Sequence, residues 1–350
     1  MAQSSDALVK REIVDKVGRV YDDYRLIIYP ESSKDDKIIF GEHGGLTFGI
    51  DGVEYGSCDA CWAKAGDWYN PYDNRIVPLT PIIAIEATDA LNTGSSGNAQ
   101  YQRFHHALGA VKSGIIGVYY LRNGSYKIQP DLYGMAVSAS KIERGTYLIL
   151  NDLDEVKKLV RSSKCEHSLR KFIDDKLQEM EKIYSDAFRS RYKDLDDFAR
   201  KRSTIIKDSY IIKYAGRMKR NFTDGDQRAG HIAVGEMYLT KYLFSSQEKP
   251  MLYLWPRMLR EDVIDLDRKK KDDKEWKLLR HEPGVEIITL DDLIGVPESV
   301  VTTMQSIQDK PLKGSPLKDY NKAIYIIDQG LRNDSIEVDE TILSRIRQES

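Results

Sequence analysis

The stretch SCDACW at residues 57–62 and the stretch PIIAIEATD at residues 81–89 decide the fold that this sequence predicts. The second stretch is too short and too rich in β-branched residues for a helix, which predicts a buried strand. The first stretch ends a β-prone run that follows the tight turn Asp51-Gly52, so we expect a neighbouring antiparallel strand. Each stretch contains one carboxylate: Asp59 in the first and Glu86 in the second.

The segments around these stretches predict a compact α/β unit over residues 1–163. From Leu8 onward, apolar residues recur at intervals of three and four, which predicts an amphipathic helix over about 5–26. Short β-prone runs, KIIFGE and LTFGI, then lead into an antiparallel meander. The later elements expected are a loop at 66–75, helices at 98–113, at 131–142 and from Asp152, and strands at 114–121 and 146–150.

Residues 164–350 predict a second region that is helical and α+β. Apolar residues repeat at helical spacing and no Gly or Pro occurs from Tyr147 to Ala215, which predicts one long helix over about 167–202. We interpret the apolar stripe of this helix as core packing or dimer contact. Short strands are expected at 251–255, 285–290 and 322–328, and residues 336–350 predict a strand and a short helix.

Length and composition indicate an ordinary globular protein. A chain of 350 residues is about twice the usual domain size, and its 41% hydrophobic residues suffice for a sizeable core. The longest apolar run is far shorter than the roughly 20 residues that span a bilayer, and the first residues lack the pattern of a secretory signal. Three cysteines, an odd number, agree with a reducing compartment. We therefore expect a cytoplasmic protein with no membrane helix.

The net charge of −2 conceals opposite local charges. Residues 1–100 carry 9 Lys and Arg against 16 Asp and Glu, whereas residues 200–228 carry 9 basic residues against 3 acidic ones. In the second segment, aromatic residues alternate with basic ones, which is typical of a surface that binds a polyanion such as DNA. A solvated surface without a ligand is the alternative. The residues that we expect to contact DNA are Arg217, Lys219, Arg220 and Arg228.

Asp59 and Glu86 are the residues best placed for chemistry. Carboxylates on adjacent strands can converge on one point, and Thr88, two residues after Glu86, lies on the same face of its strand. Mg2+ prefers oxygen ligands and keeps several waters, so the two carboxylates and the backbone carbonyl of Ala87 make a plausible open site. Such a site suits phosphodiester hydrolysis, because the metal activates a water and polarises the phosphoryl oxygens. Surface decoration is the alternative for Asp59.

On these residues the chain resembles the PD-(D/E)XK nuclease superfamily, which includes most Type II restriction endonucleases. The resemblance covers about residues 5–160 and rests on the order of elements: a helix, a three-strand meander, a helix and a further apolar strand. It implies a mixed central sheet flanked by helices, with Asp59 and Glu86 as catalytic, metal-binding residues. Two positions depart from the family pattern, since Cys58 stands where Pro is frequent and Thr88 where Lys is usual.

The resemblance also suggests where further catalytic residues lie. In some members of the superfamily, the basic group comes from the helix after the third strand. Here that helix offers Gln102, Arg103, His106 and Lys112, of which Gln102 and His106 lie away from the apolar stripe. Gln102 is the catalytic candidate, and Glu42 is a further acidic candidate in the first-strand region. Structural roles for Gln102, His106 and Glu42 stay open.

The cysteines suggest a second kind of site, one that binds zinc. Cys58-x-x-Cys61 with Cys165 and His167 contains the residue types of a structural zinc site. A strand, however, does not easily turn both thiolates of the pair toward one ion, so we expect ordinary buried cysteines. The sequence has no phosphate-loop, dinucleotide-binding, serine-hydrolase or zincin motif, which argues against those enzyme classes.

Together these features predict a Mg2+-dependent endonuclease that cuts double-stranded DNA, of the sequence-specific restriction type. Enzymes of this kind commonly act as homodimers, so that two equivalent sites cut two strands. Two alternatives remain. One is a nuclease directed by DNA structure or modification, and the other is a catalytically inactive DNA-binding module on a nuclease-like core.

Overall fold

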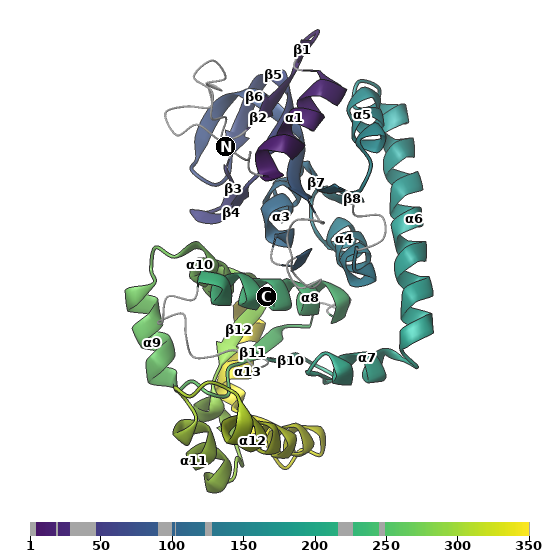
Figure 1. Ribbon diagram of the computed structural model, residues 1–350. Helices are drawn as coiled ribbons and strands as arrows, with labels where there is room; N and C mark the ends of the chain where they lie inside the picture. Colours follow the sequence, from purple (N-terminus) through teal and green to yellow (C-terminus); the bar gives the residue numbers. More distant parts are fainter. Residues whose placement is uncertain are drawn as a thin grey trace. The chain divides into compact units, whose positions relative to one another are not determined.

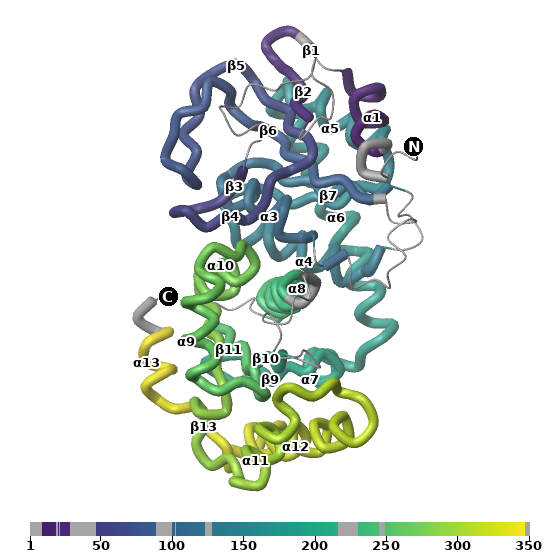
Figure 2. The backbone as a smooth tube through the Cα atoms, turned by 60° about the vertical axis from the view of Figure 1, so that its left-hand side comes forward, coloured from purple at the N-terminus to yellow at the C-terminus, as the bar shows by residue number. Residues whose placement is uncertain are grey.

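The chain forms two compact units, Met1–Arg191 and Tyr192–Ser350 (Figures 1 and 2). The structure is a computed structural model, and each unit is a mixed α/β assembly. It describes every residue except 1–4, 19, 29–46, 90–99, 102, 123–127, 216–226, 245–248 and 350.

The first unit is built on a sheet in the strand order β1-β2-β5-β6-β7-β8. Strand β5 runs antiparallel to β2 and β6, whereas β6, β7 and β8 are parallel. Parallel neighbours need a crossover, which helix α3 (Phe104–Lys112) supplies between β6 and β7 and α4 (Pro130–Ile142) between β7 and β8. The strands are β1 (Val20–Tyr21), β2 (Tyr24–Ile28), β5 (Ala60–Asn70), β6 (Arg75–Asp89), β7 (Ile116–Arg122) and β8 (Thr146–Leu150).

The two faces of this sheet carry different residues because side chains alternate along each strand. Ile83, Ile85 and Ala87 of β6 join one core cluster with α1 (Ser5–Val17), α5 (Leu153–Ser162) and α6 (Glu166–Arg191). Ala84 belongs to the cluster on the opposite face, which includes Ala110 of α3. The short hairpin β3 (Thr47–Ile50) and β4 (Val53–Ser57) packs against α3. Glu86 therefore points toward α3.

The second unit has a four-stranded sheet in the order β12-β11-β10-β9. β9 (Thr204–Ile206) is antiparallel to β10 (Ile211–Tyr214), and β10, β11 (Met251–Leu254) and β12 (Val285–Ile288) are parallel. Its helices are α7 (Leu195–Lys201), α8 (Gln227–Phe244), α9 (Arg260–Lys269), α10 (Lys274–His281), α11 (Glu298–Ser306), α12 (Gly314–Arg332) and α13 (Glu340–Glu349). A short helical turn at Leu290–Asp292 leads to a small ladder of β13 (Leu293–Ile294) and β14 (Glu337–Val338).

Most predicted elements are confirmed. The stretch 81–89 lies in β6, and the predicted strands at 114–121, 146–150, 251–255 and 285–290 correspond to β7, β8, β11 and β12. The predicted helices at 98–113, at 131–142 and from Asp152 contain α3, α4 and α5, and the last residues form β14 and α13. KIIFGE lies outside the described residues.

Apart from the long helix expected at 167–202, four predicted elements are wrong in extent or type. The first helix ends at Val17, where Gly18 adopts a left-handed φ of 85°, and β1 and β2 follow. The loop expected at 66–75 is the tip of a long β5–β6 hairpin. The stretch 57–62 is interrupted between β4 and β5, so that Asp59 precedes its strand. Residues 322–328 are helical within α12, because Tyr320, Ala323, Ile327 and Leu331 bury one helix face.

The long helix expected at 167–202 is divided into α6 and α7. The Asp194 carboxylate accepts a hydrogen bond from the backbone N–H of Asp197 at 2.8 Å and so caps a new helix start. Helix α6 packs on α4 and α5, and the chain divides into units after Arg191, whereas the sequence placed the boundary at residue 163.

Candidate functional site

Asp59 and Glu86 lie next to each other at the junction of β5 and β6. The register pairs Ala60 with Ile85, and the Asp59 Oδ2 atom accepts a hydrogen bond from the backbone N–H of Ala87 at 2.8 Å. The Asp59 side chain is 16% exposed and that of Glu86 only 3%. Burial and the neighbouring Glu86 charge together raise the pKa of Asp59 to about 6. The predicted convergence of these two carboxylates is present in the structure.

Three basic side chains from two different segments meet this pair of carboxylates. Lys10 of α1 places its Nζ 2.7 Å from the Oδ1 atom of Asp59. At Glu86, the Oε1 atom lies 3.3 Å from Nη1 of Arg103 and 3.2 Å from Nδ1 of His106. Arg103 directly precedes α3, and His106 lies in its first turn. The site is therefore a cluster of two acidic and three basic groups.

The pKa of His106 reflects two opposing effects. Burial alone would lower it, but the Glu86 charge and the hydrogen bond to Glu86 outweigh burial and raise the pKa above the ordinary value. Protonated His106 is thus favoured by its carboxylate neighbour.

A glycine allows the helix to bring His106 to this position. A Cβ atom on Gly56 of β4 would lie 2.6 Å from the Cα atom of His106, a distance that real side chains do not show. On the other side of α3, the Tyr147 hydroxyl donates a hydrogen bond to the Phe104 carbonyl at 2.9 Å and fixes the helix start. The placement of His106 therefore depends on close packing of α3 against β4.

Two buried hydroxyls lie beside Glu86. Tyr119 of β7 is its register partner, and Thr88 follows on the same face of β6. Thr88 lies near enough to lower the pKa of Tyr119, although burial raises that pKa more. Neither hydroxyl reaches hydrogen-bond geometry with a described residue. Together they add oxygen atoms to the surroundings of the two carboxylates.

The other predicted site residues either turn away from the site or lie outside the described residues. Lys112 lies on α3 but turns away from the site, since its Nζ pairs with Glu143 at 3.1 Å and lies over the Tyr55 ring. Glu42, Gln102, Arg217, Lys219 and Arg220 are outside the described residues, as is the side chain of Arg228 in α8.

Lys10 is the residue that sequence reasoning missed. It lies in α1 next to Val9, which is fully buried, so the helical pattern placed it beside the core. The pattern contained no signal that this lysine would reach Asp59, because the contact depends on how α1 packs on the sheet.

The cysteines Cys58 and Cys61 are buried in one apolar cluster. Burial raises the pKa of Cys61 to about 12 and also raises that of Cys58, which favours thiols over metal-binding thiolates. Cys165 is exposed. Within the described residues, no three or more His, Cys, Asp or Glu side chains form a group arranged to hold a metal ion.

Compared with protein-family models, curated proteins and solved structures, the chain shows no match. Among the helices of the described part, none is long and apolar enough to cross a membrane. The chemistry of the chain must therefore be inferred from its own site.

Proposed function

We propose that the first unit is a metal-dependent nuclease that hydrolyses phosphodiester bonds in double-stranded DNA. The observation that carries this proposal is the adjacency of Asp59 and Glu86 at low exposure, where burial and the Glu86 charge together raise the pKa of Asp59 to about 6. Like charges held together at low exposure are costly, and here Lys10, Arg103 and His106 offset part of that cost. A protein that retains such a pair has a use for it, and perturbed carboxylates are characteristic of functional sites.

The donor set fits Mg2+. Two carboxylates, with the hydroxyls of Thr88 and Tyr119 nearby, offer the oxygen atoms that this ion prefers, and water completes its coordination. Asp59 and Glu86 would hold the ion, which when bound supplies an activated water and polarises the phosphoryl oxygens. The order α1, β5, β6, α3, β7 supports the resemblance to the PD-(D/E)XK superfamily.

The basic groups of the site have a role in the same reaction. Lys10 and Arg103 lie beside the carboxylates, where their positive charges would balance the negative charge that develops on the phosphoryl oxygens. Lys10 would thus supply the charge that the family usually places at position 88. His106, whose pKa is raised by the neighbouring Glu86 against the effect of burial, would offset the charge of that carboxylate before a metal binds.

The proposed substrate rests on the basic segment 200–228 and on the chemistry of the site. Each phosphate contact releases counterions, so log affinity falls with log salt by roughly one unit per contact. Replacing Arg217, Lys219 and Arg220 together by Ala should flatten this dependence by about three units on two unrelated duplexes. A loss of affinity for one duplex alone would indicate base recognition. Unchanged affinity and salt dependence would mean that DNA binds to another part of the chain. Sequence specificity and a homodimer belong to the same proposal.

The test is cleavage of supercoiled plasmid with and without Mg2+. We expect nicking by the parent protein only with Mg2+, and a loss of roughly a hundredfold or more in Glu86→Gln and Asp59→Asn, because each removes one of only two ionic ligands. Glu181→Gln is the matched control, since it breaks an exposed ion pair of the same unit with Lys141. Cleavage by Glu86→Gln at near the parent rate would contradict the proposal.

A second candidate is a DNA-binding module with an inactive nuclease-like core. The observation in its favour is that Lys10, Arg103 and His106 already pair with both carboxylates. The plasmid assay separates the two functions, because tight, salt-dependent DNA binding without any Mg2+-dependent nicking would support the second.

A further inference from the structure

The second unit contains a pocket that the proposed nuclease site does not use. Its volume is about 350 Å3, within the range of small-molecule sites. Helices α9, α10 and α13, strand β12 and the turn after it line this pocket. Its charged residues are Arg260, Asp267, Arg280, Glu286, Asp292 and Arg345.

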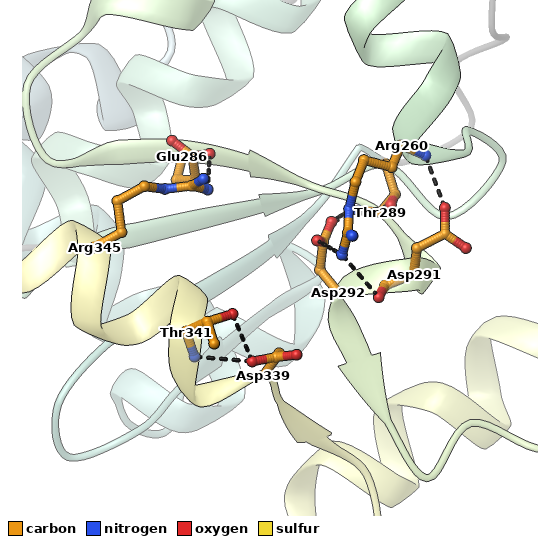
Figure 3. A network of polar contacts seen from close by, with 8 residues as sticks. All are labelled: Arg260, Glu286, Thr289, Asp291, Asp292, Asp339, Thr341 and Arg345. Carbon is orange, nitrogen blue, oxygen red and sulfur yellow. Dashed lines mark hydrogen bonds and ion pairs between the residues drawn. The ribbon is translucent and has the colours of Figure 1, made fainter.

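Each arginine of the pocket is held by one carboxylate. Arg345 of α13 reaches Glu286 of β12 with Nη2 at 2.6 Å from Oε1, and Arg260 reaches Asp292 with Nη2 at 2.8 Å from Oδ1 (Figure 3). Arg280 donates from Nε to the Oδ1 atom of Asp267 at 2.9 Å. Three guanidinium groups from three helices are thus fixed in position around one space.

The carboxylates are occupied mainly by the protein itself. The Oδ2 atom of Asp292 accepts from the backbone N–H of Thr289 at 2.8 Å and from the Thr289 hydroxyl at 3.0 Å. The Oδ1 atom of Asp267 also accepts from Nε1 of Trp276 at 3.0 Å. A carboxylate has about four acceptor positions, so Asp292 and Asp267 have little capacity left for a ligand.

The arginines, in contrast, keep donors. Each guanidinium has five N–H donors. Within the described part of the chain, Nε and Nη1 of Arg260 and Arg345 and Nη1 of Arg280 donate no hydrogen bond to another residue. The side chains of Arg260 and Arg345 are half-exposed. The pocket therefore offers oriented donors to an incoming molecule.

The charge balance of the pocket narrows the ligand class. Three arginines oppose three carboxylates, so the lining has no excess positive charge that would select a phosphate or another anion. Apolar side chains of Val263, Ile264, Ile287 and Ile342 form the remaining walls. A fitting ligand is uncharged, partly apolar and rich in hydrogen-bond acceptors.

We propose that this pocket binds a guanine base. Guanine presents the N7 and O6 acceptors side by side, which one arginine fork can engage with two hydrogen bonds. The base is uncharged and its faces suit apolar walls. The guanine could belong to a free nucleoside or to DNA, and the second source rests on the proposed nuclease function.

The first experiment measures binding of free guanosine by calorimetry. We expect binding by the full-length protein, a loss of roughly 5- to 150-fold in Arg345→Gln, and little rescue in Arg345→Lys, which keeps the charge but not the fork. Arg268→Gln is the matched control, because Arg268 is exposed on α9 and does not line the pocket. Thermal unfolding checks that each variant is folded. Equal binding of adenosine, or of guanosine by Arg345→Gln, would overturn the proposal.

The second experiment decides the source of the base. Binding is compared between a duplex that contains guanine and the same duplex with 7-deazaguanine, which lacks the N7 acceptor. If the ligand is a guanine of DNA, we expect the parent protein to bind the modified duplex more weakly than the guanine duplex. We expect no such difference between the duplexes in Arg345→Gln. If the protein binds guanosine but has equal affinity for both duplexes, the ligand is a free nucleoside. Absence of both effects refutes the pocket assignment, and neither measurement depends on cleavage, so failure of the nuclease proposal is seen separately.

Discussion

The sheets of the two units share one arrangement of strands but bury opposite charges on equivalent strands. In each, an antiparallel pair is followed by two parallel strands: β5-β6-β7-β8 in the first unit and β9-β10-β11-β12 in the second. At equivalent strands, Glu86 is in register with Tyr119, and Lys213 is in register with Tyr253. Arg103, which directly precedes α3, and His106 of α3 face Glu86, and Glu236 of α8 faces Lys213.

The two buried sites, around Glu86 in the first unit and around Lys213 in the second, differ in their balance of charge. In the second unit, Lys213 donates to the Arg202 carbonyl at 2.6 Å, and the Tyr253 hydroxyl lies 3.3 Å from Oε2 of Glu236. Burial lowers the pKa of Lys213 and raises that of Glu236, and the charge of each group opposes the effect of burial on the other. The first unit adds a second carboxylate, Asp59, and retains more exposure at Arg103 and His106. We interpret the balanced pair of Lys213 and Glu236 as a structural feature. The adjacent carboxylates of Asp59 and Glu86, which a cation from the solvent can reach, suggest a binding site.

Breaking the balanced pair should have the largest effect on stability. We expect Glu236→Gln to lower the free energy of unfolding by about 3 kcal/mol or more, because it leaves Lys213 buried without its carboxylate. The double variant Lys213→Met, Glu236→Leu should lose much less. Urea denaturation measures both, with Asp265→Asn at an exposed ion pair as control. A negligible cost of Glu236→Gln would remove the structural role assigned to this pair.

Removing Asp59 should have the opposite effect on stability, and the effect should depend on pH. The folded-state pKa of about 6 exceeds the ordinary value, so the contribution of Asp59 to stability is fully present below pH 4 and is lost as pH rises through 6. Asp59→Asn should therefore match the parent near pH 4 and be more stable by up to about 3 kcal/mol at pH 8.

The control for this comparison is Asp154→Asn. The hydrogen bond from Lys16 lowers the pKa of Asp154, which has the opposite sign, so this variant should gain no stability at high pH. Urea denaturation at both pH values gives the result. A parent protein that is more stable than Asp59→Asn at pH 8 would show that burial and the Glu86 charge do not raise the pKa of Asp59.

Removing Lys10 should give a smaller shift. The Lys10 charge lowers the pKa of Asp59, although burial and Glu86 raise it more. In Lys10→Met we therefore expect the midpoint of the Asp59 titration, followed by NMR without Mg2+, to move upward by roughly one unit. Lys16→Met on the same helix, which removes a pair with exposed Asp154, should leave the midpoint unchanged. A midpoint that moves equally in both variants would mean that Lys10 has no specific effect on Asp59.

Sequence patterns predicted those helices and strands in which the spacing of apolar residues reflects which side of the element is buried. The short stretch rich in β-branched residues around Ile83 and Ile85 identified β6, and Glu86 lies within it. The short apolar run at 322–328 was misassigned because strand and buried helix look alike at that length, and only Tyr320 and Leu331 outside it extend the helical spacing. Lys10 and the register of Lys213 with Tyr253 depend on contacts between distant segments, for which a single sequence has no signal.

Calorimetric titration with Mg2+ at pH 8 tests most directly whether adjacent carboxylates form a cation site. We expect one binding event in the parent protein, its loss in Asp59→Asn and Glu86→Gln, and its retention in folded Glu236→Gln. Equal Mg2+ binding by the parent, Asp59→Asn and Glu86→Gln, or no binding by the parent, would contradict this expectation.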